Sequence, residues 1–226
     1  MSYLRSFFRY LHWSGLNTMD LARFVPQTPG WRLAHIPPRL AWDDVRRAIK
    51  RIDATSAIGK RDRAMMLLIA GTGLRNKELR RLELSDIHWQ EGKVLVRRTK
   101  THRDRVVPLT HEAGAALAAY VLHARPKSSS RRVFLAAVPP IRPIERSSTI
   151  SMIVARRLRL AGIKVSRGGA HLLRHSLATR LVSQARPINE VADLLGHQSI
   201  DTTAIYVKVA LPQLATVALP FPGGAA

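Results

Sequence analysis

The chain has 226 residues, of which 46% are hydrophobic, so it can bury the core of a domain and is not expected to be disordered. It carries 37 Lys and Arg against 15 Asp and Glu, a formal charge of +22, which favours a polyanionic partner such as nucleic acid over an anionic membrane surface or a merely cationic protein. The absence of cysteine excludes disulfides, thiolate zinc sites and cysteine nucleophiles.

Residues 1 to about 24 predict one or two amphipathic helices, because Leu4, Phe7 and Leu11 recur at helical spacing. Arginines within this apolar run make it a poor signal peptide, and no window approaches roughly 18 uninterrupted apolar residues, so we expect an intracellular protein without a membrane span. The prolines of residues 25–40 predict a linker that interrupts regular structure.

Beyond the linker, most of the chain has a helical pattern. The predicted helices cover residues 41–53, 60–73, 75–84, 111–124, 148–162, 170–184, 188–197 and 200–210. The predicted strands cover residues 86–89, 93–100, 105–109 and 133–138. The second helix is expected to close on Gly71 and Gly73, and Thr110 to cap the fourth. The sequence therefore predicts a mainly α fold with a small antiparallel β-sheet, in the α+β class.

The stretch GTGLRNKEL, residues 71–79, is the first with a chemical pattern. Its glycines permit a sharp turn, and Arg75 follows at the start of the next helix, where a guanidinium and a helix N-terminus both favour a phosphate oxygen. Glu78, one turn later, is placed to hold Arg75. An ordinary helix end followed by a surface arginine explains the same residues.

The stretch VRRTKTHRDRVVPL, residues 96–109, predicts a basic hairpin suited to a nucleic-acid groove, although a charged hairpin in water is the commoner case. Lys100 is placed to reach a phosphate or a leaving oxygen. The candidate DNA-binding residues are Arg97, Arg98, Arg103 and Arg105.

In HLLRHSLATR, residues 171–180, His171, Arg174 and His175 share one helix face because they stand at i, i+3 and i+4. A guanidinium with two imidazoles suits a phosphate, whereas a solvated basic face needs no ligand. A zinc site is disfavoured, because the glutamate of a zinc-protease helix is absent and the arginine would repel a cation.

The stretch LLGHQSIDTTAIY, residues 194–206, places His197 just after a helix-ending Gly196 and Tyr206 in the next helix. Helical tyrosines beside apolar residues usually belong to the core. A tyrosine near two arginines is instead a candidate nucleophile, because nearby cations favour its phenolate.

Together and in this order, TGLRNKEL, RTKTHRDRVVPL, HLLRHSLAT and LLGHQSIDTTAIY resemble the active-site motifs of the tyrosine recombinases, the phage-integrase and Xer-type site-specific recombinases. The resemblance implies their catalytic-domain fold for residues 36–210. Residues 1–35 resemble only the end of the family's N-terminal helical DNA-clamping domain and its linker. Residues 211–226 form an apolar C-terminal tail, a candidate for docking on a neighbouring protomer or on its own subunit.

The resemblance also implies a mechanism. Tyr206 attacks a DNA phosphodiester, leaving a 3′-phosphotyrosyl enzyme and a free 5′-hydroxyl. Arg75, Arg174 and His197 stabilise the charge that grows on the non-bridging oxygens. Because the covalent bond conserves the energy of the broken linkage, we expect no cofactor and no metal.

Proton transfer is assigned by the same resemblance. His171 acts as the general base toward the tyrosine, and Lys100 protonates the leaving 5′-oxygen. Glu78 and His175 are expected to support these residues without reacting.

The expected partners are double-stranded DNA and further copies of this chain, as a tetramer in the synaptic complex, in the cytoplasm at the nucleoid and without a membrane. The resemblance favours a DNA integrase or recombinase of a mobile element or of chromosome maintenance. A type IB topoisomerase-like enzyme and a truncated, non-exchanging DNA-binding protein are the alternatives.

Overall fold

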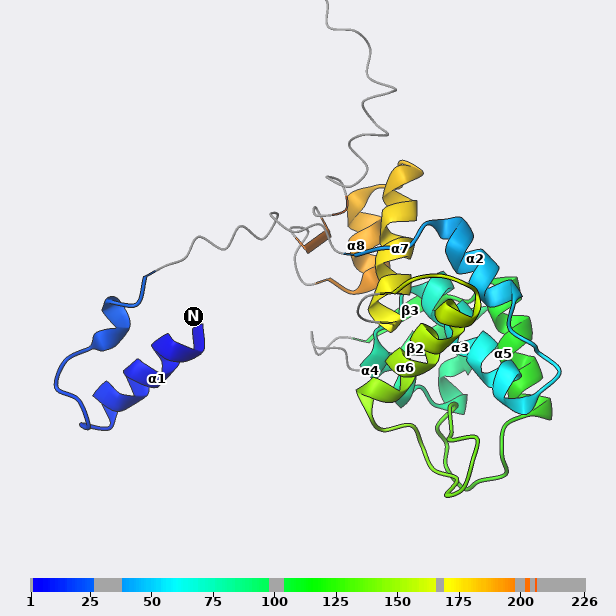
Figure 1. The fold of residues 1–226 in the computed structure, drawn as a ribbon, viewed down its shortest axis with the longest axis horizontal. Coiled ribbons are helices and arrows are strands. Elements are labelled where there is room, and N and C mark those ends of the chain that lie inside the picture. The colour runs from blue at the N-terminus through cyan, green and yellow to red at the C-terminus, as the bar shows by residue number, and fades with distance from the viewer. Residues whose placement is uncertain are drawn as a thin grey trace, which may run out of the picture. The chain divides into compact units, whose positions relative to one another are not determined.

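The computed structural model describes residues 2–26, 38–97, 104–165, 169–197, 202–203 and 206. It divides the chain into two units, Met1–His35 and Ile36–Ala226. In the first unit, α1 spans Ser2–Trp13 and a short 3-10 helix spans Leu21–Arg23 (Figure 1). The side chain of Arg5 donates to the carbonyl of Val25 at 2.6 Å, which fastens the 3-10 turn to α1. The predicted N-terminal helix is confirmed.

The second unit is mainly helical, with one small sheet, so the predicted fold class is confirmed. Its helices are α2 (Trp42–Lys50), α3 (Ala57–Thr72), α4 (Asn76–Arg81), α5 (His111–His123), α6 (Ser147–Leu160), α7 (Ala170–Ser183) and α8 (Ile188–Leu195), with a 3-10 turn at Leu84–Asp86. Its strands are β1 (Ile87–His88), β2 (Lys93–Val96) and β3 (Arg105–Pro108). None of the helices in the described ranges has the length and hydrophobicity needed to cross a bilayer.

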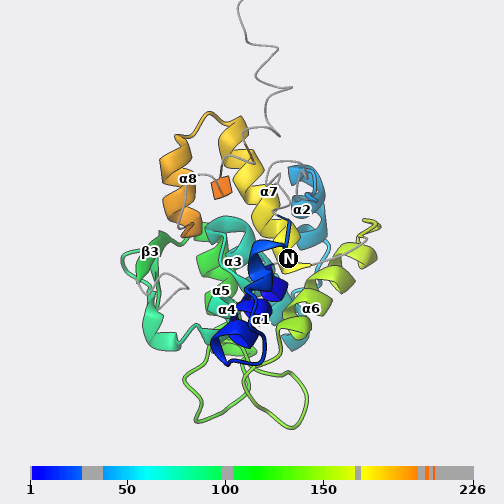
Figure 2. The same ribbon diagram turned by 90° about the vertical axis from the view of Figure 1, so that its left-hand side faces the viewer.

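Helix α3 is the centre of the core, and its second half is buried on nearly all sides because residues 64–70 are all apolar. Met65, Leu68 and Ile69 are fully buried. The helix packs against α5 and α7, and α7 lies beside α8 in both views (Figure 1 and Figure 2). The carboxyl end of α3 is thereby held among elements that come from the second half of the chain.

The three strands form an antiparallel sheet in the order β1-β2-β3, with Val94 opposite Val107. Both valines are fully buried and join the core beneath the sheet. Helix α5 follows β3 and is capped by Thr110, whose side chain accepts a hydrogen bond from the backbone of Ala113, as predicted.

Of the two glycines predicted to close the second helix, Gly73 is confirmed, because its left-handed φ of 66° ends α3. Gly71 was wrong, because the helix continues through it. A second prediction was also wrong. Residues 133–138 form no strand: the nearby pairing consists of isolated bridges, Glu83 with Arg132 and Leu135 with Pro143. Val133, Phe134 and Leu135 are buried in an irregular loop, and the prolines that follow the segment lack the backbone donors that a ladder requires.

We predict that Gly73→Ala lowers the free energy of unfolding by about 2–4 kcal/mol. A Cβ at this position would lie 2.5 Å from Leu195 Cδ2, and the backbone has a positive φ. Gly162→Ala is the matched control, because Gly162 also has a positive φ, 77°, but a Cβ placed there would meet no atom within 4 Å. Urea denaturation of both variants separates the cost of an alanine at positive φ, which both variants share, from the cost of the contact with Leu195, which only Gly73→Ala has. Equal losses would contradict a close approach of α8 to the end of α3.

Candidate active site

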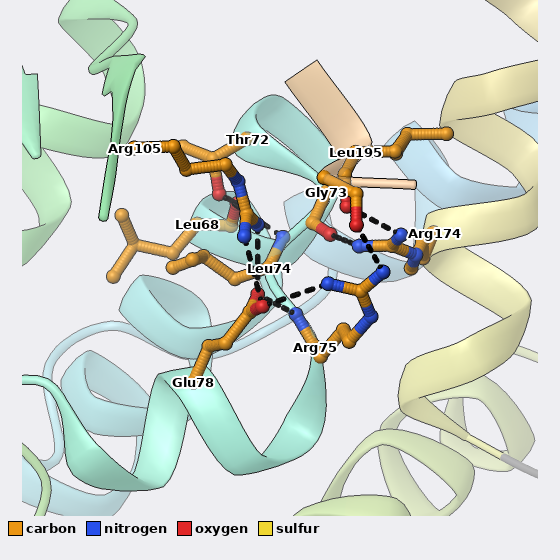
Figure 3. A network of polar contacts seen from close by, with 10 residues as sticks. Leu68, Thr72, Gly73, Leu74, Arg75, Glu78, Arg105, Arg174 and Leu195 are labelled. Atoms are coloured by element: carbon orange, nitrogen blue, oxygen red, sulfur yellow. Dashed lines mark hydrogen bonds and ion pairs between the residues drawn. The ribbon is translucent and has the colours of Figure 1, made fainter. Parts of the chain in front are cut away.

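Several segments of the second unit meet at the carboxyl end of α3, as Figure 3 shows. The residues that meet are Gly73 at the end of α3, Arg75 and Glu78 at the start of α4, Arg105 of β3, Arg174 of α7, and Leu195 and Gly196 at the end of α8. The cluster combines three guanidinium groups with one carboxylate, so it carries a net positive charge.

The carboxylate of Glu78 lies at the buried centre of this cluster, with its side chain 5% exposed. Its Oε1 accepts hydrogen bonds from Nη1 of Arg75 and Nη1 of Arg105, both at 2.9 Å. Its Oε2 accepts from Nη2 of Arg105 and from the backbone nitrogen of Arg75, both at 2.8 Å. Burial raises the pKa of Glu78, but the hydrogen bond and charge of Arg105, followed by those of Arg75, lower it to about 2.

The guanidinium groups of Arg75 and Arg174 are fastened to neighbouring backbone carbonyls. Nη2 of Arg75 donates to the carbonyl of Gly196 at 2.6 Å. Arg174, which is 4% exposed, donates to the carbonyl of Gly73 and to that of Leu195, the latter at 2.6 Å. Burial and then the charge of Arg75 lower the pKa of Arg174 to about 9, so it is still charged at neutral pH. Two fixed guanidinium groups in one place suit a tetrahedral anion such as a phosphate.

Tyr206 lies beside this cluster and is 3% exposed. Its hydroxyl shares a hydrogen bond of 2.5 Å with Nδ1 of His175. Its ring stacks on that of His197, with the ring planes 11° apart and the centroids separated by 6.4 Å. His197 is in turn hydrogen-bonded through Nδ1 to Oγ1 of Thr203 at 2.7 Å. The tyrosine is thus enclosed by the two histidines.

The ionisation of Tyr206 differs from the expectation that nearby cations favour its phenolate. Burial raises the pKa of the phenol, and the charge of Arg174 opposes that effect without reversing it. The tyrosine is therefore neutral at physiological pH and needs a base before it can attack a substrate.

His171, His175 and His197 are also neutral at pH 7. Burial first, and then neighbouring positive groups, lower the pKa of His175 to about 4 and that of His197 to about 3. Burial and the charge of Arg174 lower the pKa of His171. The rings of His171 and His175 lie 6.4 Å apart on α7. A neutral imidazole can accept a proton, so each is chemically able to serve as a base.

The predicted hairpin residues are described only in part. Lys100, Arg98 and Arg103 lie outside the described residues. Arg97 is paired with the buried carboxylate of Asp86, and its side chain remains 55% exposed. Arg105 points inward onto Glu78, and its side chain is only 13% exposed.

Sequence reasoning identified one polar partner of the site: the predicted contact of Glu78 with Arg75 is confirmed. It missed the pairing of Arg105 with Glu78, the contact of His197 with Thr203 and the backbone carbonyls that accept from the arginines. The spacing within DTTAIY placed Thr203 one turn before Tyr206, a usable but weak signal. Within the part of the chain that the structure describes, no group of three or more His, Asp or Glu is arranged to hold a metal ion.

Comparison with known proteins relates this arrangement to one family. The model of the phage integrase family matches residues 38–211. A putative integrase/recombinase, y4rF of Sinorhizobium fredii, is 62% identical over 100% of this chain and 53% of its own length. The tyrosine recombinase XerA of Thermococcus kodakarensis is 33% identical over 93% of this chain and 70% of its own length. The chain spans about half the length of y4rF and of y4rA, a second relative from the same organism.

Solved structures resemble the fold as well. A crystal structure of XerA recombinase superimposes with a TM-score of 0.70 at 26% identity, covering 96% of this chain and 82% of that one. A lambda integrase dimer bound to a COC′ core site has the same fold, with a TM-score of 0.67 at 22% identity, covering 91% of this chain and 70% of that one.

We predict that Glu78→Gln lowers the free energy of unfolding at neutral pH by about 3 kcal/mol, the value of a pKa displaced from 4.5 to about 2. The folded-state pKa is depressed, so the carboxylate stabilises the fold above pH 4.5 and this stabilisation is lost as the pH falls toward 2. Urea denaturation between pH 7 and pH 3 measures it. The curves of wild type and variant should converge on acidification, and parallel curves would contradict the assigned ion pairing.

Proposed function

Because the chain belongs to the phage integrase family, we propose that it is a site-specific DNA recombinase that breaks and rejoins DNA through a 3′-phosphotyrosyl intermediate. The observation that carries the proposal is the convergence of an arginine pair, the histidines of α7, the histidine that follows α8 and a tyrosine. Arg75 and Arg174 donate to the adjacent carbonyls of Gly196 and Leu195, although Gly196 lies 121 residues after Arg75. Tyr206 lies next to them, between His175 and His197.

The proposed cleavage is a transesterification at phosphorus. The hydroxyl oxygen of Tyr206 attacks the phosphodiester, the P–O5′ bond breaks, and a P–O bond to tyrosine forms. Arg75 and Arg174 neutralise the charge that develops on the non-bridging oxygens, with His197 beside them. Because the number of phosphoester bonds is unchanged, the step needs no nucleotide hydrolysis.

Two protons move during cleavage. We assign the proton of Tyr206 to His171 as general base, with His175 orienting the hydroxyl through its 2.5 Å hydrogen bond. A protonated Lys100 supplies the proton that the leaving 5′-oxygen takes up. Rejoining reverses both transfers when the 5′-hydroxyl of a second DNA attacks the phosphotyrosine.

The proposed partners are double-stranded DNA and further copies of the chain. The structure of lambda integrase with its core site, and that of XerH with a difH substrate, hold DNA on the same fold, which supports a DNA partner here. Exchange between two duplexes requires four active tyrosines, so we propose a tetramer on DNA, acting at the nucleoid in the cytoplasm. The curated relatives are integrases and Xer recombinases, which disfavours a topoisomerase-like or purely DNA-binding role.

The proposed domain organisation follows the sequence. Residues 36–210 form the catalytic domain, and residues 1–35 are a remnant or the end of an N-terminal helical DNA-clamping domain with its linker. The tail of residues 211–226 is proposed to dock on a protomer. Arg97, Arg98 and Arg103 remain candidate DNA-binding residues of the hairpin, whereas Arg105, which was predicted with them, is bound to Glu78 inside the cluster.

We predict that cells expressing this chain contain DNA bound covalently to it, and that Tyr206→Phe removes this DNA while leaving non-covalent DNA binding intact. Phenylalanine keeps the buried ring but lacks the nucleophilic oxygen. Denaturing the lysates, purifying the chain and sequencing the attached DNA measures the adduct and identifies the target. A folded, DNA-bound wild-type chain without adducts would contradict the proposed chemistry.

A second prediction separates the two histidines of α7. Glutamine forms hydrogen bonds but does not titrate, so His171→Gln should lower the rate of adduct formation by roughly 10²–10⁴-fold if His171 is the base. His175→Gln should cost about tenfold, because the amide can still hold the hydroxyl of Tyr206. Single-turnover cleavage of the recovered DNA gives both rates. A larger loss at position 175 would reassign the base to His175.

A further inference from the structure

Arg105 is the residue of β3 that reaches furthest into the candidate active site. Its Nη1 and Nη2 bind the two carboxylate oxygens of Glu78 at 2.9 and 2.8 Å. This parallel pair of bonds uses the planar fork of a guanidinium, which a lysine lacks. Figure 3 shows Arg105 and Arg75 approaching the carboxylate from different sides.

Arg105 also contacts the turn that follows α8. Gly196 has a positive φ of 62°, and a Cβ placed on it would lie 2.7 Å from Nη1 of Arg105. The guanidinium therefore lies directly against the backbone of Gly196, where only a glycine leaves it room. The carbonyl of the same glycine accepts from Arg75.

Arg105 and Arg75 thus contact the same two residues, Glu78 and Gly196. Within the described residues, the side chain of Arg75 donates to Oε1 of Glu78 and to the backbone carbonyl of Gly196. Arg105 contacts both of these residues. Arg105 thus binds one acceptor of Arg75 directly, the carboxylate of Glu78, and packs against the residue that provides the other, Gly196.

The charges of Glu78, Arg75 and Arg105 also indicate that Arg105 supports Arg75. One carboxylate serves two guanidinium groups, so Glu78 does not fully neutralise Arg75 while Arg105 is present. Among the influences that keep Glu78 ionised despite its burial, Arg105 precedes Arg75. Without Arg105, the whole negative charge of Glu78 would fall on Arg75, and Arg75 would attract a phosphate less strongly.

We propose that Arg105 is a positioning residue, which acts through Glu78 and Gly196 to hold Arg75 in place and to keep its charge available for a phosphate. The proposal rests on the proposed function, because it assigns Arg75 to the scissile phosphate. It differs from a role for Arg105 as a direct DNA contact.

A double-mutant cycle tests the proposal. Arg105→Met should weaken binding of inorganic phosphate on the order of tenfold, measured from the arginine side-chain signals in NMR spectra. Adding Glu78→Gln to Arg105→Met removes the carboxylate charge from Arg75 and should restore the part of this affinity that was lost because Glu78 neutralised Arg75. Arg63→Gln is the matched control, because Arg63 pairs with Glu112 at 3.3 Å on α3 and α5, away from the cluster, and should change nothing.

Cleavage provides the second readout. With the DNA recovered from the adducts, Arg105→Met should lower the single-turnover rate at saturating DNA about tenfold or more while the DNA dissociation constant changes less than about threefold, because an orienting group is lost and not a DNA contact. The double variant should recover only the part of the rate that depends on the charge of Arg75, because it also lacks the carboxylate that orients Arg75. Arg105→Lys keeps the charge but loses the fork, so it should show a smaller loss, and it replaces Arg105→Met if that variant does not fold.

The outcomes are distinct. Weaker DNA binding without rescue by Glu78→Gln would overturn the proposal in favour of direct DNA contact by Arg105. Unchanged phosphate affinity and cleavage rate in Arg105→Met would also overturn it. A wild-type chain that forms no adduct would count against the proposed function alone, because the phosphate-binding cycle is measured without cleavage.

Discussion

The buried carboxylate of Glu78 is the constraint on which the candidate site depends. It accepts from the side chains of Arg75 and Arg105, and so it joins α4 to β3 at one point. An isolated buried carboxylate would be strongly unfavourable, whereas one shared by two guanidinium groups remains ionised. The sheet contributes few residues to the core, but through Arg105 of β3 it controls the geometry of Arg75 at the start of α4.

Glycines at helix ends provide the second constraint. Gly73 and Gly196 both adopt a left-handed conformation and end α3 and α8. At these ends the last carbonyls lack partners within the helix, and arginine side chains from elsewhere satisfy them: Arg174 binds the carbonyls of Gly73 and Leu195. The same backbone groups that terminate two helices therefore hold the cationic side chains of the site.

The fold class and most elements were predictable, because helical periodicity, the Thr110 cap and the alternating strands are local signals. The four motifs predicted that Arg75, Arg174, His197 and Tyr206 belong together, since their order along the chain resembles one family. Long-range partners were not predictable: the inward direction of Arg105 depends on a carboxylate 27 residues away. The raised pKa of Tyr206 follows from its burial, which its apolar sequence neighbours allowed as an alternative to an ionised nucleophile without deciding between the two. The irregular path of residues 133–138 depends likewise on tertiary packing.

The fastening of Arg174 to two carbonyls has a consequence for binding thermodynamics. A free arginine side chain samples many rotamers, and restricting it costs about 2 kcal/mol of conformational entropy. In this chain the entropy of the Arg174 side chain is already lost when the protein folds, because its guanidinium is hydrogen-bonded to the carbonyls of Gly73 and Leu195. An anion that binds Arg174 meets a preorganised donor and bears little of this entropic cost, so more of the interaction energy remains to discriminate between a ground state and a more highly charged transition state.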